Sequence, residues 1–160
     1  MIIAIPKESN HNETRVSCSP SGVKALIKAG FSVNIEKDAG LKSFYTDEEF
    51  EQSGAKIVSN SKKLFSESDI IIKVNPPSIE EIKNFKSKCV YISFFQTTRC
   101  LNEVKALTEK SITGFSMHLI PRTTLAQKMD ALSSQANIAG YKSVLMAATR
   151  LGVYMPLLMT

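Results

Sequence analysis

The chain has 160 residues, close to the length of one typical domain, so two complete domains are not expected. Its 43% hydrophobic and 22% charged residues, with 7 Gly and 6 Pro, exclude disordered, collagen-like and low-complexity classes. Lys and Arg exceed Asp and Glu by five, but the basic residues are scattered singly, so we expect a solvated surface and no nucleic-acid partner.

The first helical pattern lies between two strand patterns. Ile2–Ile5 is a β-branched run that predicts the first strand. Ser19 and Pro20 are typical of a helix N-cap and first turn, and the predicted helix ends at Gly30. Alternation from Phe31 to Ile35 then predicts a second strand.

The next segment opens with a capping box. Thr46 with Glu49 predicts a short acidic helix that ends at Gly54. A brief third strand is expected at 55–58. The continuous apolar run at 70–74, interrupted by one lysine, predicts a strand buried on both faces.

The remaining strands follow the same alternation with helices. Ser78 and Glu81 form a second capping box. We expect strands at 90–95 and 113–119, with a helix at 102–110 between them. The order predicts an α/β fold with a flavodoxin-like parallel sheet of about six strands and flanking helices.

A long helix is predicted from Leu125 to Leu151, because no proline and only Gly140 interrupt this stretch. The expected domains are therefore an α/β domain at 1–124 and, at 125–160, a long helix with a connection toward a further domain. The apolar tail at 153–160 favours such a continuation, because free termini are usually polar.

The spacing of the cysteines and the length of the apolar runs indicate the cellular compartment of the protein. Cys18, Cys89 and Cys100 are odd in number and lack CxxC spacing, so neither a disulfide framework nor a metal site is expected. A reducing, cytoplasmic compartment fits this usage best. The first apolar run is too short for a signal peptide, and no apolar stretch is long enough to span a bilayer.

Glycine spacing excludes the usual phosphate-binding loops. The seven glycines are never two residues apart, so the chain contains no GxG. Dinucleotide fingerprints and P-loops need closely spaced glycines, because backbone N–H groups must approach the phosphates. Any pyrophosphate site must therefore be completed elsewhere.

The densest polar cluster follows the last predicted strand, where open α/β sheets bind ligands. If the predicted helix starts at Leu125, then Gln127, Asp130 and Ser133 share one of its faces, with Arg122 in the preceding turn. Together they offer groups able to orient a carboxamide-bearing ring. From spacing alone, an ordinary polar helix start, with Asp130 paired to Arg122, is the favoured interpretation.

Residues 120–141, IPRTTLAQKMDALSSQANIAGY, resemble the Arg-Gln-Asp loop of the NAD(H)-binding domain I of proton-translocating NAD(P) transhydrogenase alpha subunits. The start, IAIPKE at 3–8 with NETRV at 12–16, is similar to the start of that subunit and of the related alanine dehydrogenases, and IKVNP at 72–76 fits the same pattern. The resemblance covers essentially the whole chain.

This resemblance implies that the loop orients the nicotinamide of NAD(H) for hydride transfer to NADP(H) on a partner domain, with no side chain acting as acid or base. The implied NAD(H)-binding residues are Arg122, Thr123, Thr124, Leu125, Gln127, Asp130 and Ser133. It also implies NADP-binding and membrane domains as partners, a homodimer, a place at the cytoplasmic side of the inner membrane, and a Rossmann domain outside this chain. The chain alone is then expected to be inactive.

Four positions bear on the choice between a transhydrogenase and an alanine dehydrogenase. Arg15 and Lys73 match residues that hold the substrate carboxylate in those enzymes. Gln96, however, stands where they carry a catalytic His, and an amide cannot shuttle a proton. His118 stands where transhydrogenases usually have an acid, and we interpret it as a polar residue at the cleft rim. A stand-alone, non-catalytic flavodoxin-like binding module also remains possible.

Overall fold

The computed structural model describes residues 1–153 and divides into two compact units, Met1–Leu119 and a second that begins at Ile120. The apolar tail and the end of the predicted 125–160 segment fall on residues 154–160, outside the described residues. No helix within residues 1–153 is long and apolar enough to cross a membrane.

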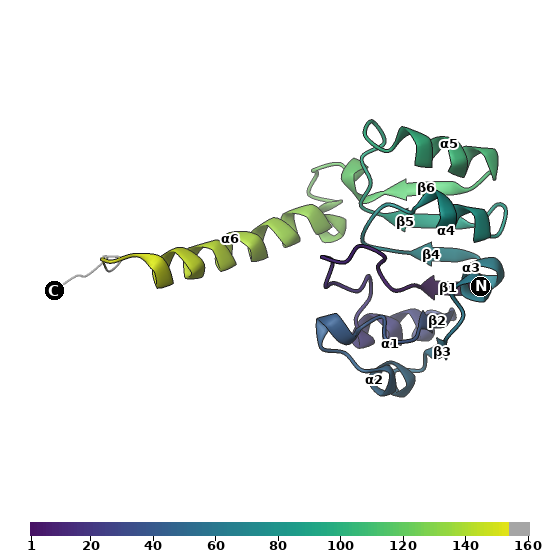
Figure 1. Cartoon of the computed structure of the whole chain (residues 1–160), viewed down its shortest axis with the longest axis horizontal. Coiled ribbons are helices and arrows are strands. Elements are labelled where there is room, and N and C mark those ends of the chain that lie inside the picture. Colours follow the sequence, from purple (N-terminus) through teal and green to yellow (C-terminus); the bar gives the residue numbers. More distant parts are fainter. Residues whose placement is uncertain (154–160) are drawn as a thin grey trace. The chain divides into compact units, whose positions relative to one another are not determined.

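The first unit is a six-stranded parallel sheet with helices on both faces (Figure 1). The strands are β1 (Ile2–Ile5), β2 (Ser32–Glu36), β3 (Lys56–Val58), β4 (Ile70–Ile72), β5 (Val90–Ser93) and β6 (Thr113–Ser116). The helices are α1 (Pro20–Lys28), α2 (Asp47–Gln52), α3 (Ser61–Glu67), α4 (Ile79–Asn84) and α5 (Leu101–Glu109), with 3-10 turns η1 (Leu41–Ser43) and η2 (Met117–Leu119). The predicted α/β class and strand number are confirmed.

The strands lie in the order β3-β2-β1-β4-β5-β6. This is the 3-2-1-4-5-6 order of classic doubly wound α/β sheets, whereas the predicted flavodoxin-like sheet has the order 2-1-3-4-5. The order reverses between β1 and β4, so the crevice at their carboxyl ends is the topological switch point of the sheet.

The predicted helix starts are formed as the sequence indicates. Ser19 accepts a hydrogen bond from the Gly22 N–H at 3.3 Å, with Pro20 as the first helical residue of α1. Both predicted capping boxes close, at the starts of α2 and α4. Gly30 and Gly54 follow α1 and α2 with φ of 90° and 95°, a conformation that costs glycine little.

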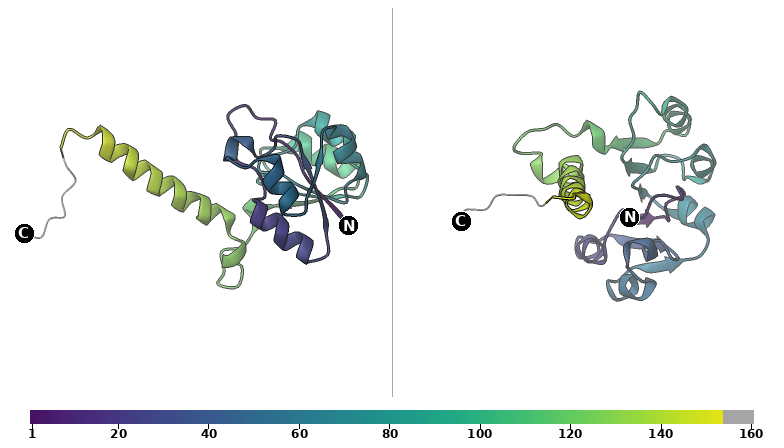
Figure 2. Two further views of the ribbon diagram at one scale, coloured as in Figure 1. Left: turned by 90° about the horizontal axis from the view of Figure 1, so that it is seen from below. Right: turned by 60° about the vertical axis from the view of Figure 1, so that its left-hand side comes forward.

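Two apolar clusters, one on each face, hold the sheet between its helices. Figure 2 shows α3, α4 and α5 along one face, where they cover the cluster that includes Ala4, Ile71 and Tyr91. The other cluster includes Ile3 and Ile5 and is covered by α1 and α2.

Several sequence predictions require correction. The strands expected at 90–95 and 113–119 end at Ser93 and Ser116, and η2 follows the second of them. The apolar run at 70–74 is a strand only at 70–72, and it is not buried on both faces: Ile71 is fully buried, but Ile70 and Ile72 are half-buried. Helix α3 was not predicted, because its polar sequence carries only two core residues. The start of the long helix also differs from the prediction.

The second unit contains the turn η3 (Gln127–Met129) and the helix α6 (Ala131–Arg150). The predicted helix start at Leu125 is therefore wrong by six residues. Asp130 has φ −77° and ψ 77°, which is not helical, and its side chain caps α6 instead. Asp favours caps over helix interiors because its carboxylate competes for backbone N–H groups.

Candidate functional site

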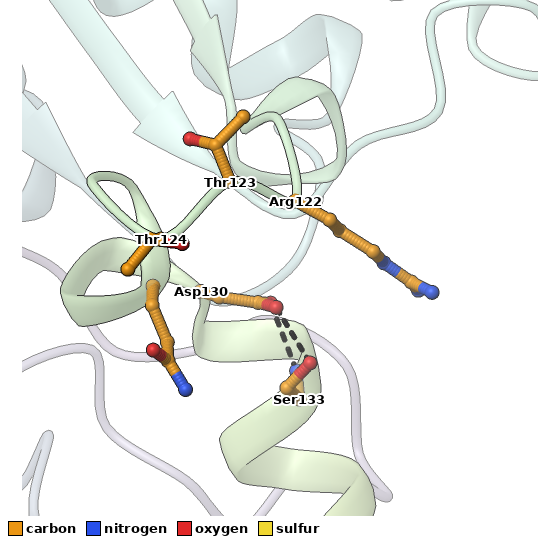
Figure 3. A pocket seen from close by; sticks show the side chains of 6 residues that line it. Arg122, Thr123, Thr124, Asp130 and Ser133 are labelled. Atoms are coloured by element: carbon orange, nitrogen blue, oxygen red, sulfur yellow. Dashed lines mark hydrogen bonds between the residues drawn. The ribbon is translucent and has the colours of Figure 1, made fainter.

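A pocket of about 330 Å³ lies within the second unit, on the loop that precedes α6. Figure 3 shows its polar lining from close by. The lining residues are Arg122, Thr123, Thr124, Gln127, Asp130 and Ser133. These are six of the seven residues predicted to bind the cofactor. Leu125, the seventh, is 90% exposed and is not part of the lining.

The loop reaches α6 through successive tight turns. Ala126 is buried, and its N–H donates to both the hydroxyl (3.3 Å) and the carbonyl (3.1 Å) of Thr123. The Met129 N–H then donates to the Ala126 carbonyl at 2.8 Å and the Asp130 N–H to the Gln127 carbonyl at 3.2 Å. Thr123 is thus a turn residue whose hydroxyl fixes the backbone around the pocket.

The predicted common helix face for Gln127, Asp130 and Ser133 is wrong. Gln127 lies in η3, Asp130 is the N-cap, and only Ser133 belongs to α6. The three residues nevertheless line one pocket, because the turn brings Gln127 back to the helix start. Sequence spacing therefore predicted that these residues lie together, as they do, but not how the backbone brings them together.

Asp130 is held by Ser133. Its carboxylate accepts a hydrogen bond from the Ser133 N–H at 2.9 Å and another from the Ser133 hydroxyl at 2.5 Å (Figure 3). These bonds lower the pKa of the Asp130 carboxyl, first through the hydroxyl and then through the N–H, and the Arg122 charge adds to the effect. Asp130 therefore remains ionised at neutral pH.

Arg122 and Asp130 do not pair as the alternative interpretation predicted. No ion pair joins them within residues 1–153, and the Arg122 side chain in Figure 3 points away from Asp130. The pocket therefore presents a guanidinium, an amide and hydroxyls as separate groups. Its lining also includes the Asp130 carboxylate, which Ser133 engages, so the pocket offers donors and acceptors able to bind a polar group.

The first unit holds a separate charged cluster at the carboxyl ends of β1 and β4. Lys73, whose side chain has no exposed surface, has its Nζ 2.6 Å from Glu81 Oε1. The Arg15 guanidinium donates to Glu13 from Nε at 2.8 Å and from Nη2 at 2.7 Å. Both cations that match the carboxylate-holding residues of alanine dehydrogenases thus contact carboxylates of this chain.

A third carboxylate fastens the segment after β1 to the end of β4. Glu8 accepts hydrogen bonds from the Val74 N–H at 2.6 Å, and from the backbone and side-chain N–H groups of Asn75 at 3.2 and 3.1 Å. The Asn75 amide also donates to Glu13 at 3.0 Å. Sequence reasoning missed these contacts, because they join residues more than sixty positions apart.

The electrostatics of Glu13 reflect this packing. Hydrogen bonds from Arg15 lower the pKa of the Glu13 carboxyl to about 2, against an opposing effect of burial. Glu13 therefore remains ionised throughout the physiological range.

Gln96 and His118 lie near the carboxyl end of β5. Gln96 is exposed, and its carbonyl accepts bonds from the N–H groups of Arg99 and Cys100 at 2.9 and 3.0 Å, which shapes the turn before α5. The His118 ring packs edge-on against Phe94, with 6.0 Å between ring centroids. His118 is half-buried.

Comparisons with known proteins agree with this architecture. Residues 4–139 match the family model described as alanine dehydrogenase/PNT, N-terminal domain. The chain is 41% identical to the NAD(P) transhydrogenase subunit alpha of Haemophilus influenzae over 96% of the chain and 30% of that protein. It is 36% identical to an alanine dehydrogenase of Methanococcus maripaludis over 92% of the chain and 39% of that protein.

A solved structure gives the same result in three dimensions. The transhydrogenase from Sinorhizobium meliloti superposes with a TM-score of 0.92 and 40% identity, over the whole of this chain and 48% of that one. The chain thus spans less than half the length of these relatives.

Proposed function

Because the chain belongs to the alanine dehydrogenase/PNT N-terminal domain family, we propose that it forms part of the NAD(H)-binding component of an NAD(P) transhydrogenase. In this role it orients the nicotinamide of NAD(H) while hydride passes to or from NADP(H) on a partner domain. The observation that carries the proposal is the pocket before α6, whose lining brings together six of the seven residues implied by the transhydrogenase resemblance.

The lining fits the nicotinamide end of the dinucleotide. A carboxamide has an oxygen acceptor and an N–H₂ donor. Arg122 supplies donors, Gln127 supplies both kinds of group, and the Thr124 hydroxyl can act either way. A pocket of about 330 Å³ suits one ring and its ribose rather than a complete dinucleotide. The adenosine and pyrophosphate must therefore be held by residues outside this chain.

The chemistry at this pocket is orientation. When bound, the dihydronicotinamide supplies the hydride, so the chain need provide no nucleophile and no proton carrier. Asp130 and Ser133 lock the start of α6, and the turn anchored by Thr123 sets the position of Gln127. A rigid set of polar groups is what the near-attack placement of two rings requires.

The test uses a complete transhydrogenase that carries this chain as the matched part of its alpha subunit. Gln127→Asn shortens the amide by one methylene, and a displacement of about 1 Å can slow transfer on the order of 100-fold. We expect the first turnover in stopped-flow measurements to slow while nucleotide affinity changes much less. Lys128→Gln, at the adjacent exposed position, serves as the control. An unchanged first turnover in the Gln127→Asn variant would remove Gln127 from the site.

Alanine dehydrogenase activity is the second candidate, favoured by the match to that enzyme and by the presence of Arg15 and Lys73. Gln96 argues against it, because oxidative deamination needs a group that accepts a proton. The complete protein is expected to form no pyruvate from alanine. Turnover of about one per second, ordinary for an enzyme, would reverse the assignment.

The rest of the proposal concerns the assembly. We infer that the complete protein couples hydride transfer to proton translocation through NADP-binding and membrane domains, and that it forms a homodimer at the cytoplasmic side of the inner membrane. A stand-alone, non-catalytic binding module is the remaining alternative. Detection of hydride transfer by the complete assembly distinguishes the two.

A further inference from the structure

A second polar pocket, of about 290 Å³, lies in the first unit and is lined by residues of β2, β3 and α3. Strand β3 is the outer strand at one edge of the sheet (Figure 1). The polar side chains of the lining are those of Asn34, Lys56, Ser59, Asn60, Lys63 and Glu67. We name this pocket the β3–α3 pocket. It shares no residue with the pocket before α6.

Parallel pairing brings two of these polar side chains side by side. Asn34 of β2 pairs with Lys56 of β3, so both side chains project from the same face of the sheet. Ile35, the next residue of β2, is buried in the cluster covered by α1 and α2. Asn34 and Lys56 therefore project from the opposite face, on which α3 packs. Lys63 of α3 lines the same pocket, so one cation comes from the strand and one from the helix.

Much of the hydrogen-bonding capacity of the β3–α3 pocket is not used by the chain itself. Asn34 is half-buried, and its side-chain amide forms no hydrogen bond with any described residue. Lys56 forms no ion pair within residues 1–153. Amides that are withdrawn from solvent are ordinarily hydrogen-bonded. The Asn34 amide and the Lys56 ammonium are thus available to a ligand.

The charge of the lining favours an anion. Lys56 and Lys63 supply two positive charges, and Glu67 supplies one negative charge. Glu67 lies 3.9 Å from Lys63 Nζ, and both side chains are more than half exposed, so this ion pair is weak. A phosphate monoester carries a charge of about −1.5 to −2 at neutral pH and three strong acceptor oxygens. Two lysines match that charge better than they match the single charge of a carboxylate.

The size of the β3–α3 pocket indicates a ligand larger than phosphate alone. Its volume of about 290 Å³ is close to the 330 Å³ of the pocket that suits a ring and its ribose. The Asn34 amide and the Ser59 hydroxyl offer donors and acceptors to the hydroxyl groups of a ligand. The buried side chain of Leu64 provides apolar surface in the same lining.

We propose that the β3–α3 pocket binds a small phosphorylated molecule, a sugar phosphate or a mononucleotide. Lys56 and Lys63 hold the phosphate, and Asn34 binds a hydroxyl group of the remainder. The site binds its ligand without making or breaking a covalent bond. The inference does not rest on the proposed function, because no residue of the pocket before α6 takes part.

The experiment titrates the 160-residue chain with ribose 5-phosphate and with adenosine 5′-monophosphate. Binding is followed by calorimetry and by the backbone amide resonances in NMR spectra. Inorganic phosphate, which lacks the sugar, and ribose and adenosine, which lack the phosphate, are the matched probes. Lys56→Gln removes one cation from the pocket. Lys62→Gln removes the same charge from an exposed position outside the lining and is the control variant.

We expect at least one phosphorylated probe to bind saturably, to shift the amide resonances of residues 56–63, and to bind about tenfold or more tightly than inorganic phosphate. Ribose and adenosine should not bind. Lys56→Gln should weaken binding about tenfold or more, because a hydrogen bond to a charged group is lost. Lys62→Gln should change the affinity less than about twofold. Tighter binding of the nucleotide assigns the site to mononucleotides, and tighter binding of ribose 5-phosphate assigns it to sugar phosphates.

A third variant tests the amide. Asn34→Asp keeps the shape of the side chain but places a carboxylate beside the phosphate, so binding should weaken further than in Lys56→Gln. The amide resonances report whether this variant is folded. The two lysine variants change exposed side chains, so they keep the test valid if Asn34→Asp does not fold.

Four results would overturn the proposal. The first is that neither phosphorylated probe binds saturably. The second is equal affinity for inorganic phosphate, which means that the pocket does not recognise the remainder of the ligand. The third is equal weakening by Lys56→Gln and Lys62→Gln, which indicates a general effect of charge. The fourth is a set of shifted resonances confined to residues 122–133, which assigns the binding to the pocket before α6.

Discussion

The two carboxylate oxygens of Glu81 contact different residues. Oε1 lies 2.6 Å from Lys73 Nζ, and Oε2 accepts a hydrogen bond from the Ser78 N–H at 2.7 Å, at the start of α4. Glu81→Gln retains an acceptor for Ser78 but leaves the fully buried ammonium of Lys73 without a counter-charge. Breaking one side of a buried pair typically costs about 3–5 kcal/mol, and we expect a loss of that order in urea unfolding.

The double variant Lys73→Met/Glu81→Gln is the matched control for this prediction. Because it removes the buried charge together with its partner, it should be more stable than Glu81→Gln alone. If the losses of Lys73→Met and Glu81→Gln simply add in the double variant, the two side chains are not energetically coupled and the prediction is contradicted.

The second prediction concerns acid stability. The pKa of Glu13 is lowered from 4.5 to about 2 in the folded chain, chiefly by Arg15. A group with a depressed folded-state pKa stabilises the fold above its unfolded value and loses that effect as the pH falls through the folded value. The Glu13 contribution should therefore be complete above about pH 4.5 and decline toward pH 2.

Glu13→Gln should accordingly flatten the pH dependence of the unfolding free energy between those limits. Glu109→Gln, on the exposed side of α5, is the control and should leave the pH dependence unchanged. If the unfolding free energy changes with pH equally in the Glu13→Gln variant and in the unmodified chain, Arg15 does not hold the Glu13 carboxyl in its charged form.

The third prediction separates the cap from the charge at Asp130. Asp130→Ala removes the acceptor of the Ser133 N–H, and loss of an N-cap costs about 1 kcal/mol. Amide hydrogen exchange at Ser133 and Ser134 should become faster. Asp130→Asn, also a good cap, should preserve most of the protection. If Asp130→Ala and Asp130→Asn lose the same amount of protection from hydrogen exchange, the charge of Asp130, rather than the cap geometry, stabilises the start of α6.

The fourth prediction concerns affinity for the cofactor. The chain contains no GxG, and the pocket before α6 can hold little more than the nicotinamide end. Isothermal titration of the isolated chain with NADH should therefore give a dissociation constant weaker than micromolar. Submicromolar binding, worth more than about 8 kcal/mol, would mean that a larger part of the dinucleotide is held here.

Periodicity and capping residues predicted the sheet because each strand and most helices carry local signals. The capping boxes at Thr46 and Ser78 both formed as expected. The strand at Ile70 was predicted to be buried on both faces because apolarity alone does not reveal whether a covering helix is present. Burial depends on the partner that packs on a strand, and the sequence of the strand does not contain that partner.

The sequence predicted that the polar residues of the candidate site lie together, and not the geometry that brings them together. Gln127, Asp130 and Ser133 were placed on one helix face, since spacings of three favour that arrangement. The helix instead begins after Asp130, whose carboxylate caps it. The bonds from Glu8 and Glu13 to Asn75 could not be predicted, because single-sequence patterns contain no information about pairs so distant along the chain.

The two edges of the sheet differ in how they discourage self-association. The outer strand β3 carries the exposed Lys56, a charge of the kind that prevents edge strands from pairing with other chains. The outer strand β6 consists of Thr113, Gly114, Phe115 and Ser116, and Phe115 is 56% exposed. An uncharged edge beside exposed apolar surface is an aggregation hazard. At high concentration, copies of the isolated chain should therefore aggregate through the edge strand β6. A charged residue introduced at Thr113 should slow this aggregation.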